Sequence, residues 1–524
     1  MADGARRPAA APSAAEMAAV AFVAVLFVVW RTGVLAAHGD PVGVDIGNVL
    51  RIARSWQGGV DVDDVVYPPI VPLLAWSAQA VVGTAWAAHL LQGLASVAPA
   101  LGVWAVSRRF RGPAVAAAAG LAVGVATGTS AAAAWGGVPQ LLGLGLLPGV
   151  VLAADRWVRA PDRRRALVWG GGLLLVIMIS TLVAGAAVVA SVVTIVVTVL
   201  VGVDRSVGSR LAALLRSVGW ALAPPALAIP WYVDVARVQS LPDGRSTELR
   251  GTAALTVVLG PPAWLWWGVA AAAIIATATA LRRDQAGSTV AIGLLAAALV
   301  GLLIGEVRAA YVVPTALATA LALTWPVGSV DRPTTERQRD ARASLARAAV
   351  AWALVAWMVV LAPSRFGDQV VSYGRFTPDG TLRAARWLAD RAVVGDRVVA
   401  APVDGVPTGW WIEAEGVDAW VAARAEWLFF PGERRTAAVA EELLSAASWP
   451  DGGALERLEA CGVDWVVLPA AWGGVDEDAL DRAVAAGRVR IAFDDGVTTV
   501  LAVGGSAANA ESDVTVPAWV CPIS

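Results

Sequence analysis

The chain has 524 residues, of which 57% are hydrophobic and only 16% are charged, and its mean hydropathy is +0.65. This composition excludes a wholly soluble protein and indicates an integral membrane protein with many spanning helices. The formal net charge of −2 argues against nucleic acid as a partner, because a nucleic-acid-binding surface needs an excess of positive charge.

The first fifteen residues form a short basic tail that we expect in the cytoplasm. The apolar stretch 17–36 that follows resembles a secretory signal in composition. It runs through Trp30 and Arg31 without a cleavage site of small residues, so the sequence predicts an uncleaved first span and a membrane domain that starts at residue 16.

Residues 38–68 are predicted to form a loop outside the membrane, with its carboxylates gathered in one place. Within the loop, residues 45–57 have apolar side chains at helical spacing and predict an amphipathic helix. Residues 69–83 begin with two prolines and are too short to span comfortably, so we expect a helix along or dipping into the interface. The acidic residues of the loop are Asp40, Asp45, Asp61, Asp63 and Asp64.

Six short arginine-rich segments set the expected orientation, because cytoplasmic loops are enriched in Lys and Arg. Between them the apolar stretches pair as hairpins. An even number of spans must separate the N-terminus from the first internal arginine-rich loop, which is why residues 69–83 are not counted as a span. About eleven transmembrane helices follow, the last at 346–363. The arginine-rich segments are 5–7, 108–111, 155–165, 204–216, 282–284 and 331–342.

Residues 364–505 have ordinary composition and predict an extracytoplasmic α/β domain, followed by a C-terminal tail, 506–524. The "FDDG" sequence at 493–496 predicts a hairpin turn. Cys461 and Cys521 are the only cysteines, and the sequence leaves open whether they pair. The predicted helices are 381–391, 434–447 and 477–486, and the predicted strands are 397–401, 465–468, 489–493 and 498–503.

Several motifs in these regions resemble the GT-C superfamily of multi-span membrane glycosyltransferases, in particular mannosyltransferase- and arabinosyltransferase-like members. They are "GVDIGNVLRIA" (43–53) and "YPPIVPLL" (67–74) in the outer loop, and "TLRAARWLADRAVVGDRVVAAP", "GWWIEAEG" and "GVDWVVLP" in the tail. The resemblance implies a bacterial plasma-membrane enzyme. It would transfer a sugar, with inversion, from a polyprenyl-phosphate donor to a cell-envelope glycan, lipid or protein on the outer face.

Asp45 is the candidate general base of such a reaction, since an attacking hydroxyl needs a carboxylate within hydrogen-bond reach. The alternative is that Asp45 only caps a helix. Asp40 is a second candidate, and the two acids could share a divalent cation, Mg or Mn, because some members of the superfamily use one. The only two histidines, His38 and His89, fall short of a zinc site.

Arg308 and Tyr311 match the Arg that precedes an apolar "P..ALA" helix in the superfamily, where it can meet the donor phosphate. Arg and Tyr also serve as interfacial anchors, which is the alternative. Tyr67 opens the Tyr-Pro-Pro motif and is a candidate substrate contact. Trp410 and Trp411 are candidates for stacking on a sugar, with core packing as the alternative role.

Two other classes of function stay open. A flippase for lipid-linked sugars, or a polysaccharide exporter, would have a similar number of spans. A coupled transporter generally needs charged residues inside its spans, and the predicted spans hold almost none. A membrane scaffold with an exterior domain is the other possibility.

Overall fold

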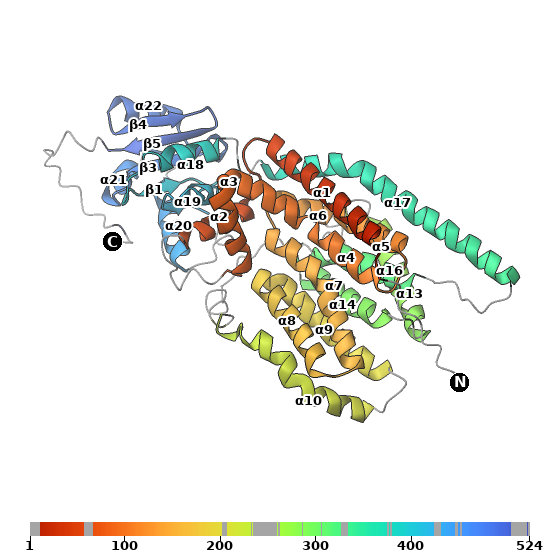
Figure 1. The fold of residues 1–524 in the computed structure, drawn as a ribbon. Coiled ribbons are helices and arrows are strands. Elements are labelled where there is room, and N and C mark those ends of the chain that lie inside the picture. Colours follow the sequence, from red (N-terminus) through yellow and green to blue (C-terminus); the bar gives the residue numbers. More distant parts are fainter. Residues whose placement is uncertain are drawn as a thin grey trace. The chain divides into compact units, whose positions relative to one another are not determined.

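The computed structural model describes residues 11–56, 67–201, 207–231, 233, 259, 263–283, 285, 287–304, 307–325, 334–374, 377, 380–423, 431–445, 449–450, 453–504 and 521 (Figure 1). The chain divides into two compact units. Unit 1 contains Met1–Thr32, Gln92–Pro230 and Thr247–Gln369. Unit 2 contains Gly33–Leu91, Trp231–Ser246 and Val370–Ser524.

Unit 1 is helical in its described residues. Long apolar segments favour helices in lipid because a helix satisfies its own backbone N–H and C=O groups. The helices are α1 (Ala14–Ala37), α4 (Ala98–Arg108), α5 (Pro113–Gly124), α6 (Thr127–Trp135), α7 (Val138–Arg159), α8 (Arg163–Ile179), α9 (Thr181–Val201), α10 (Val207–Ala226), α13 (Ala263–Arg282), α14 (Ser288–Ile304), α15 (Val307–Ala310), α16 (Val312–Thr324) and most of α17 (Thr334–Gly374).

Within the described residues, four helical segments are long and apolar enough to cross a membrane, or five if the bent pair α5 and α6 counts as one span. Three further apolar helices are shorter, so the expected number of about eleven spans stays a prediction. The four segments are Ala14–Ala37, Ile70–Arg108, Val138–Arg159 and Thr181–Val201, and the shorter helices are Trp267–Arg282, Ser288–Ile304 and Arg308–Thr324.

The helix α9 carries an exposed apolar stripe. Val188, Val192, Val196 and Leu200 are all exposed and recur every four residues, which places them on one face of the helix. A continuous apolar face of this kind is stable against lipid tails and not against water. The stripe therefore supports a membrane location for unit 1.

Helices of unit 1 approach one another closely at glycines. A Cβ atom added at Gly102 of α4 would collide with the backbone of Gly145 in α7, and one added at Gly145 would collide with Ala98. Small residues at such contacts let helix backbones pack by van der Waals attraction, which drives helix association in lipid. The Ala- and Gly-rich composition of the bundle thus allows its helices to pack closely.

Arg31 is one of the few ionisable residues within a predicted span. Arg31 of α1 is fully buried, and its Nη2 donates hydrogen bonds to the Gly124 carbonyl (2.7 Å) and to Ser130 Oγ (3.0 Å). Gly124 ends α5, and α6 starts at Thr127 after a bend of 47°. The end of α5 leaves carbonyls without helical partners, and Arg31 supplies a donor to one of them.

Asp155 was expected in a cytoplasmic loop, but α7 continues through it to Arg159. Asp155 is buried, pairs with Arg159 at 2.8 Å, and accepts hydrogen bonds from Thr198 (3.1 Å) and Thr289 (2.7 Å). Arg159 is on the same helix, but Thr198 and Thr289 lie on α9 and α14, so no local pattern in the sequence could have revealed those two partners. The predicted loop at 155–165 is correspondingly shorter, since α8 begins at Arg163.

Unit 2 contains a five-stranded sheet in the order β2-β1-β3-β5-β4. The neighbours of β1 run parallel to it, whereas β5 runs antiparallel to both β3 and β4. Helices lie between most of the strands in sequence. The elements are α18 (Thr381–Ala389), β1 (Val398–Ala400), α19 (Trp410–Ala414), β2 (Ala419–Val421), α20 (Pro431–Leu444), α21 (Ala454–Ala460), β3 (Trp465–Pro469), the 3-10 helix η3 (Ala470–Trp472), α22 (Glu477–Ala485), β4 (Val489–Asp494) and β5 (Thr498–Val503).

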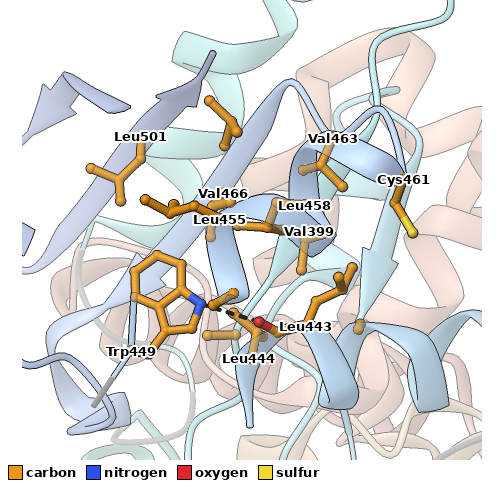
Figure 2. Close-up of a cluster of buried hydrophobic side chains, with 14 of the residues drawn as sticks. Val399, Leu443, Leu444, Trp449, Leu455, Leu458, Cys461, Val463, Val466 and Leu501 are labelled. Carbon is orange, nitrogen blue, oxygen red and sulfur yellow. Dashed lines mark hydrogen bonds between the residues drawn. The ribbon is translucent and has the colours of Figure 1, made fainter. Parts of the chain in front are cut away.

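The sheet and its helices enclose a hydrophobic core (Figure 2). Val466 and Leu501 from the central strands meet Leu455 and Leu458 of α21 there, and all four are buried. The indole of Trp449 is fully buried and donates a hydrogen bond to the Leu443 carbonyl at 3.2 Å. A core of this size indicates that the tail is a folded domain and not an extension of the membrane bundle.

The two cysteines form a disulfide, with their Cα atoms 5.0 Å apart. This settles the question that the sequence left open. Cys461 follows α21, at the edge of the core in Figure 2. The bond therefore ties the end of the chain to the folded domain.

Predictions for the tail are largely confirmed. The predicted strands match β1, β3, β4 and β5, and the "FDDG" turn joins β4 to β5. The predicted helices match α18, α20 and α22. The sequence did not predict β2, α19 and α21, which have three, five and seven residues, too few for a clear period in hydrophobicity.

The outer-loop segment forms two helices that belong to unit 2 in whole or in large part: α2 (Val44–Ser55) and α3 (Ile70–Ala95). The expected helix at 45–57 corresponds to α2. The backbone of α3 breaks at Gly83 (φ 75°), the residue at which the expected interfacial helix ends. Whether residues 69–83 lie along the membrane surface stays a prediction.

Candidate functional site

The candidate donor-phosphate residues lie together in unit 1. Arg308 is in the short helix α15, and Tyr311 directly precedes α16. Tyr311 is buried and lies 6.2 Å, between ring centroids, from Trp135 at the end of α6. The guanidinium of Arg308 lies 4.3 Å from the same Trp135 ring. The three side chains form one cation–aromatic cluster.

This cluster borders a cavity of about 190 Å³ within unit 1. Aliphatic side chains from α7, α9 and α14 line most of the cavity, whereas Arg308, Tyr311 and Gln140 supply its polar groups. The Oε1 atom of Gln140 is buried without a hydrogen-bond partner in the described protein. An apolar cavity with a cation and polar groups at its wall can hold an amphiphile that has an anionic end.

Sequence reasoning missed Trp135 and Gln140. Neither residue belongs to a motif, and both are ordinary components of an apolar helix. Trp135 ends α6 because Gly136 adopts the left-handed conformation (φ 95°) that terminates many helices. The Trp-Gly-Gly sequence at 135–137 was a local signal for a helix end, but nothing in it indicates contact with Arg308.

Asp45 lies in the first turn of α2, in unit 2, and only 6% of it is exposed. The helix begins at Val44, and Gly43 occupies the N-cap position with φ 103°. The interpretation of Asp45 as the N-cap residue is therefore wrong, because the helix starts one residue earlier than expected. A carboxylate in the first turn is still stabilised by the helix dipole.

Asp40 precedes α2 and contacts the tail domain. Its Oδ2 accepts a hydrogen bond from the Gly380 backbone N–H at 2.7 Å. Gly380 adopts φ 102° just before α18. Asp40 thus has a structural partner at the start of α18, and it ties the outer loop to the tail domain.

The paired tryptophans of α19 pack against α2. Trp410 and Trp411 are both buried. The guanidinium of Arg51 lies 5.0 Å from the Trp410 ring and 3.3 Å from Glu413 Oε2. A Cβ at Gly47 would contact Trp411 at 3.1 Å. This placement corresponds to the packing role.

Because α2 and α19 pack on each other, the segment that contains Asp45 is part of the same compact unit as the tail domain. Tyr67 lies partly buried just before α3. Its role as a substrate contact stays a prediction.

Among the described residues, no group of three or more His, Cys, Asp or Glu side chains could hold a metal ion. Asp61, Asp63 and Asp64 lie outside the described residues. Asp40 and Asp45 alone offer too few ligands for a Mg or Ca site made by protein, although water and substrate oxygens commonly complete such sites. The divalent cation stays a prediction.

Comparison with known proteins gives a fold but no close relative. No protein-family model matches the chain, and no curated protein matches it. ArnT from Cupriavidus metallidurans in the apo state is similar, with 17% identity, a TM-score of 0.58, and coverage of 95% of this chain and 100% of ArnT. ArnT bound to undecaprenyl phosphate is similar at 15% identity, with the same TM-score and coverage.

Two other structures share the arrangement. The arabinofuranosyltransferase AftD from Mycobacteria has 17% identity and a TM-score of 0.55, over 96% of this chain and 40% of AftD. The oligosaccharyltransferase of Archaeoglobus fulgidus in the apo form has 14% identity and a TM-score of 0.54, over 87% of this chain and 69% of that one. All of these are GT-C membrane glycosyltransferases.

The chain has the GT-C fold. The resemblance expected from the outer-loop and tail motifs is confirmed at the level of the fold. The similarity to ArnT extends over 95% of this chain and therefore includes both the helical bundle and the tail domain.

Proposed function

We propose that the protein is an inverting glycosyltransferase that moves a sugar from a polyprenyl-phosphate donor to an acceptor on the outer face of the membrane. The observation that carries this proposal is the cavity of unit 1, where aliphatic walls meet Arg308 and Tyr311. A polyprenyl phosphate has the matching chemistry, an apolar chain that ends in an anion. The ArnT structure that contains undecaprenyl phosphate is a precedent in the same fold.

The leaving phosphate gains negative charge as the bond between the anomeric carbon and the phosphate oxygen breaks. The fixed positive charge of Arg308 stabilises that charge, and its stacking on Trp135 holds the guanidinium in place. The phenol of Tyr311 can donate a further hydrogen bond to a phosphate oxygen. Aliphatic residues of the cavity would hold the first isoprene units and keep water from the phosphate.

Asp45 is the proposed base. The acceptor hydroxyl attacks the anomeric carbon from the face opposite the phosphate, which inverts the configuration, and Asp45 takes the proton from the hydroxyl. Asp45 is the first candidate because it belongs to the "GVDIGNVLRIA" motif and lies in the first turn of α2, whereas Asp40 holds the loop to the start of α18 through the Gly380 N–H. Both acids are in unit 2, and Arg308 is in unit 1.

The disulfide supports the outer location of unit 2. Disulfides persist in the bacterial periplasm and outside the cell and are rare in the cytosol. The bond joins Cys461 and Cys521 in the same unit that contains α2. A tail domain outside the membrane would put Asp45 on the outer face as well, because α2 packs on α19.

The test is transfer of radiolabelled sugar from a panel of polyprenyl-phosphate sugars in membranes that contain the protein. We expect Asp45→Asn to lower the rate by at least about 100-fold, the usual contribution of a general base. Arg308→Ala should lower it by a similar factor. Asp40→Asn is the matched control for the carboxylate and should keep most of the activity at equal expression.

Equal rates for the wild type and Asp45→Asn would remove Asp45 from the mechanism. Movement of a lipid-linked sugar across the bilayer without transfer would favour the flippase alternative. Arg31 and Asp155 are buried ionisable groups in unit 1, a feature that transporters share. Arg31 is held by Gly124 and Ser130, and Asp155 by Arg159 and two threonines, which suits packing better than proton transfer.

A further inference from the structure

A second pocket, of about 510 Å³, lies within unit 2, apart from the candidate phosphate cluster. Its volume is in the range of about 300–1,000 Å³ that is usual for small-ligand sites. Three parts of the chain meet there: the end of α2, the first half of α3, and the helices α18 and α19 of the tail domain. The residues that carry its chemistry are Arg54, Trp76, Gln79, Gly83, Arg386 and Glu415.

One stripe of α3 faces this pocket. Trp76, Gln79, Ala80 and Gly83 all line it, and they recur at i, i+3, i+4 and i+7, the spacing of one helix face. Trp76 is 45% exposed, so part of its ring is accessible. A Cβ added at Gly83 would meet nothing within 4 Å, so open space lies directly beside this residue.

The pocket contains a polar group that the protein does not use. Gln79 Nε2 makes only a long hydrogen bond to the Ala414 carbonyl, at 3.5 Å, and Gln79 Oε1 is buried without a hydrogen-bond partner in the described protein. A buried amide oxygen without a partner is unfavourable unless a ligand or water supplies a donor. A sugar hydroxyl is such a donor.

The charges of the pocket favour an anion. Arg54 and Arg386 contribute two positive charges, and Glu415 contributes one negative charge. Arg386 Nε lies 3.2 Å from Glu415 Oε1, and about half of the Arg386 side chain is exposed. The guanidinium therefore keeps N–H donors for a ligand, since it has five in all. The net charge of the lining is positive by one.

The neighbouring face of α3 is apolar and exposed. Leu73, Leu74 and Val81 are exposed and recur at i, i+1 and i+8, so they lie beside the pocket stripe on the same helix. Exposed apolar residues on an amphipathic helix favour the membrane interface. The pocket would then open at the level of the lipid head groups.

From these observations we infer that the pocket of unit 2 binds an acidic saccharide, a sugar unit that carries a carboxylate or a phosphate, as part of the acceptor. The ring packs on Trp76, a hydroxyl donates to Gln79, and the anion lies between the arginines. The identity of this saccharide as acceptor rests on the proposed function, whereas its binding does not.

The test measures binding to the full-length protein in neutral phosphatidylcholine nanodiscs without any donor lipid. Saturation-transfer NMR and calorimetry would compare trigalacturonate, mannose 6-phosphate, neutral maltotriose and glycerol 3-phosphate. We expect the two acidic sugars to bind at least about ten-fold more tightly than maltotriose, the effect of one charge-assisted hydrogen bond. Glycerol 3-phosphate, which has an anion but no sugar ring, should bind as weakly as maltotriose.

Pocket variants and control variants on the same helices test whether the acidic sugars bind in this pocket. Trp76→Ala and Arg386→Gln should each weaken binding of the acidic sugars by about ten-fold. Trp86→Ala and Arg383→Gln are the controls. Trp86 is on α3 and somewhat more exposed than Trp76, Arg383 is on α18 and somewhat more exposed than Arg386, and neither lines the pocket. These two controls should bind like the wild type.

Equal binding of acidic and neutral sugars, no binding of either acidic sugar, or equal losses in pocket and control variants would overturn the inference. Tight binding of glycerol 3-phosphate would also overturn it and indicate a site for lipid head groups. Because this experiment measures binding and not sugar transfer, its outcome does not depend on whether Asp45 is the catalytic base. Sugar binding without transfer in the wild type would refute only the proposed function.

Discussion

The guanidinium of Arg308 lies 4.3 Å from the centre of the Trp135 ring. The two residues come from different helices, α15 and α6, and the Trp135 ring also lies beside Tyr311. An arginine stacked on an indole loses fewer conformations when it binds an anion, because its orientation is already set. Trp135 is thus a positioning residue for the proposed phosphate site.

Replacement of Trp135 tests this role. Trp135→Leu should lower sugar transfer by a factor of about 2–30, which corresponds to a cation–π contribution of about 0.5–2 kcal/mol. Initial rates over a range of donor concentrations would measure it. Trp135→Phe keeps an aromatic face and should recover part of the loss. Wild-type rates in Trp135→Leu would show that Arg308 needs no support from the indole.

The contact between α4 and α7 predicts different effects for two glycines. A Cβ at Gly102 would collide with the backbone of Gly145, which has no room to move inside a packed bundle. Gly102→Ala should therefore destabilise the protein by about 1–3 kcal/mol.

Gly149→Ala is the control, because a Cβ at Gly149 of α7 meets nothing within 4 Å. Alanine favours helix over glycine by up to about 1 kcal/mol, so this variant should be neutral or more stable. Thermal unfolding in detergent would compare the two. Equal stability of both variants would mean that α4 and α7 are farther apart than described here.

The turn between β4 and β5 should make the tail domain sensitive to acid. Asp495 Oδ1 accepts hydrogen bonds from the Val497 and Thr498 N–H groups at 3.0 and 2.8 Å, and Oδ2 pairs with Arg383 at 2.8 Å. Burial alone would raise the pKa of Asp495, but the bonds to Thr498 and Val497 and the pairing with Arg383 outweigh it, so that the pKa is below its usual value.

A lowered pKa in the folded state means that the Asp495 carboxylate stabilises the fold above the unfolded pKa of about 3.9, and that this stabilisation is lost as the pH falls through the folded pKa. Asp495→Asn should therefore cost about 1 kcal/mol at pH 7 and progressively less below about pH 4. Hydrogen exchange of the Val497 and Thr498 amides, measured over a range of pH, would report this loss of stability. Asp481→Asn, an exposed acid on α22, should show no such change. A loss that does not depend on pH would contradict the assignment.

Local chemistry explains which parts of the fold the sequence predicted. The Val-rich strands and the Asp-Gly turn of the tail are signals within ten residues of each other, and β4 and β5 follow them. The end of α6 also has a local signal, because Gly136 follows its last residue. By contrast, the Gly124 carbonyl at the bend between α5 and α6 accepts a hydrogen bond from Arg31, 93 positions away in sequence. No local pattern carries that information.

The same distinction applies to the candidate site. Asp45, Arg308 and Tyr311 belong to motifs and were therefore predicted as candidates. Trp135 and Gln140 were not, because their relevance comes only from the helices that bring them to Arg308 and to the cavity. The pocket of unit 2 was also missed, since α2 and α3 are far in sequence from α18 and α19.

The disulfide gives a final prediction that also tests the orientation. The bond between Cys461 and Cys521 closes a loop of 60 residues, and closing a loop of this length restricts the unfolded chain. Cys521→Ser should lower the stability of the tail domain by about 2–4 kcal/mol, as measured by resistance to protease. Cys461→Ser should have a similar effect, because it removes the same bond and both cysteines belong to the same hydrophobic core.

Thiol labelling in intact cells supplies the complementary measurement. A membrane-impermeant maleimide should not modify the wild-type protein, because both thiols are oxidised, but it should label Cys461 in Cys521→Ser after mild unfolding from outside. Cys461 is fully buried, so labelling requires that unfolding. Labelling only after the cells are permeabilised would place the tail in the cytoplasm. Because α2 packs on α19, that result would move Asp45 to the cytoplasmic side together with the tail.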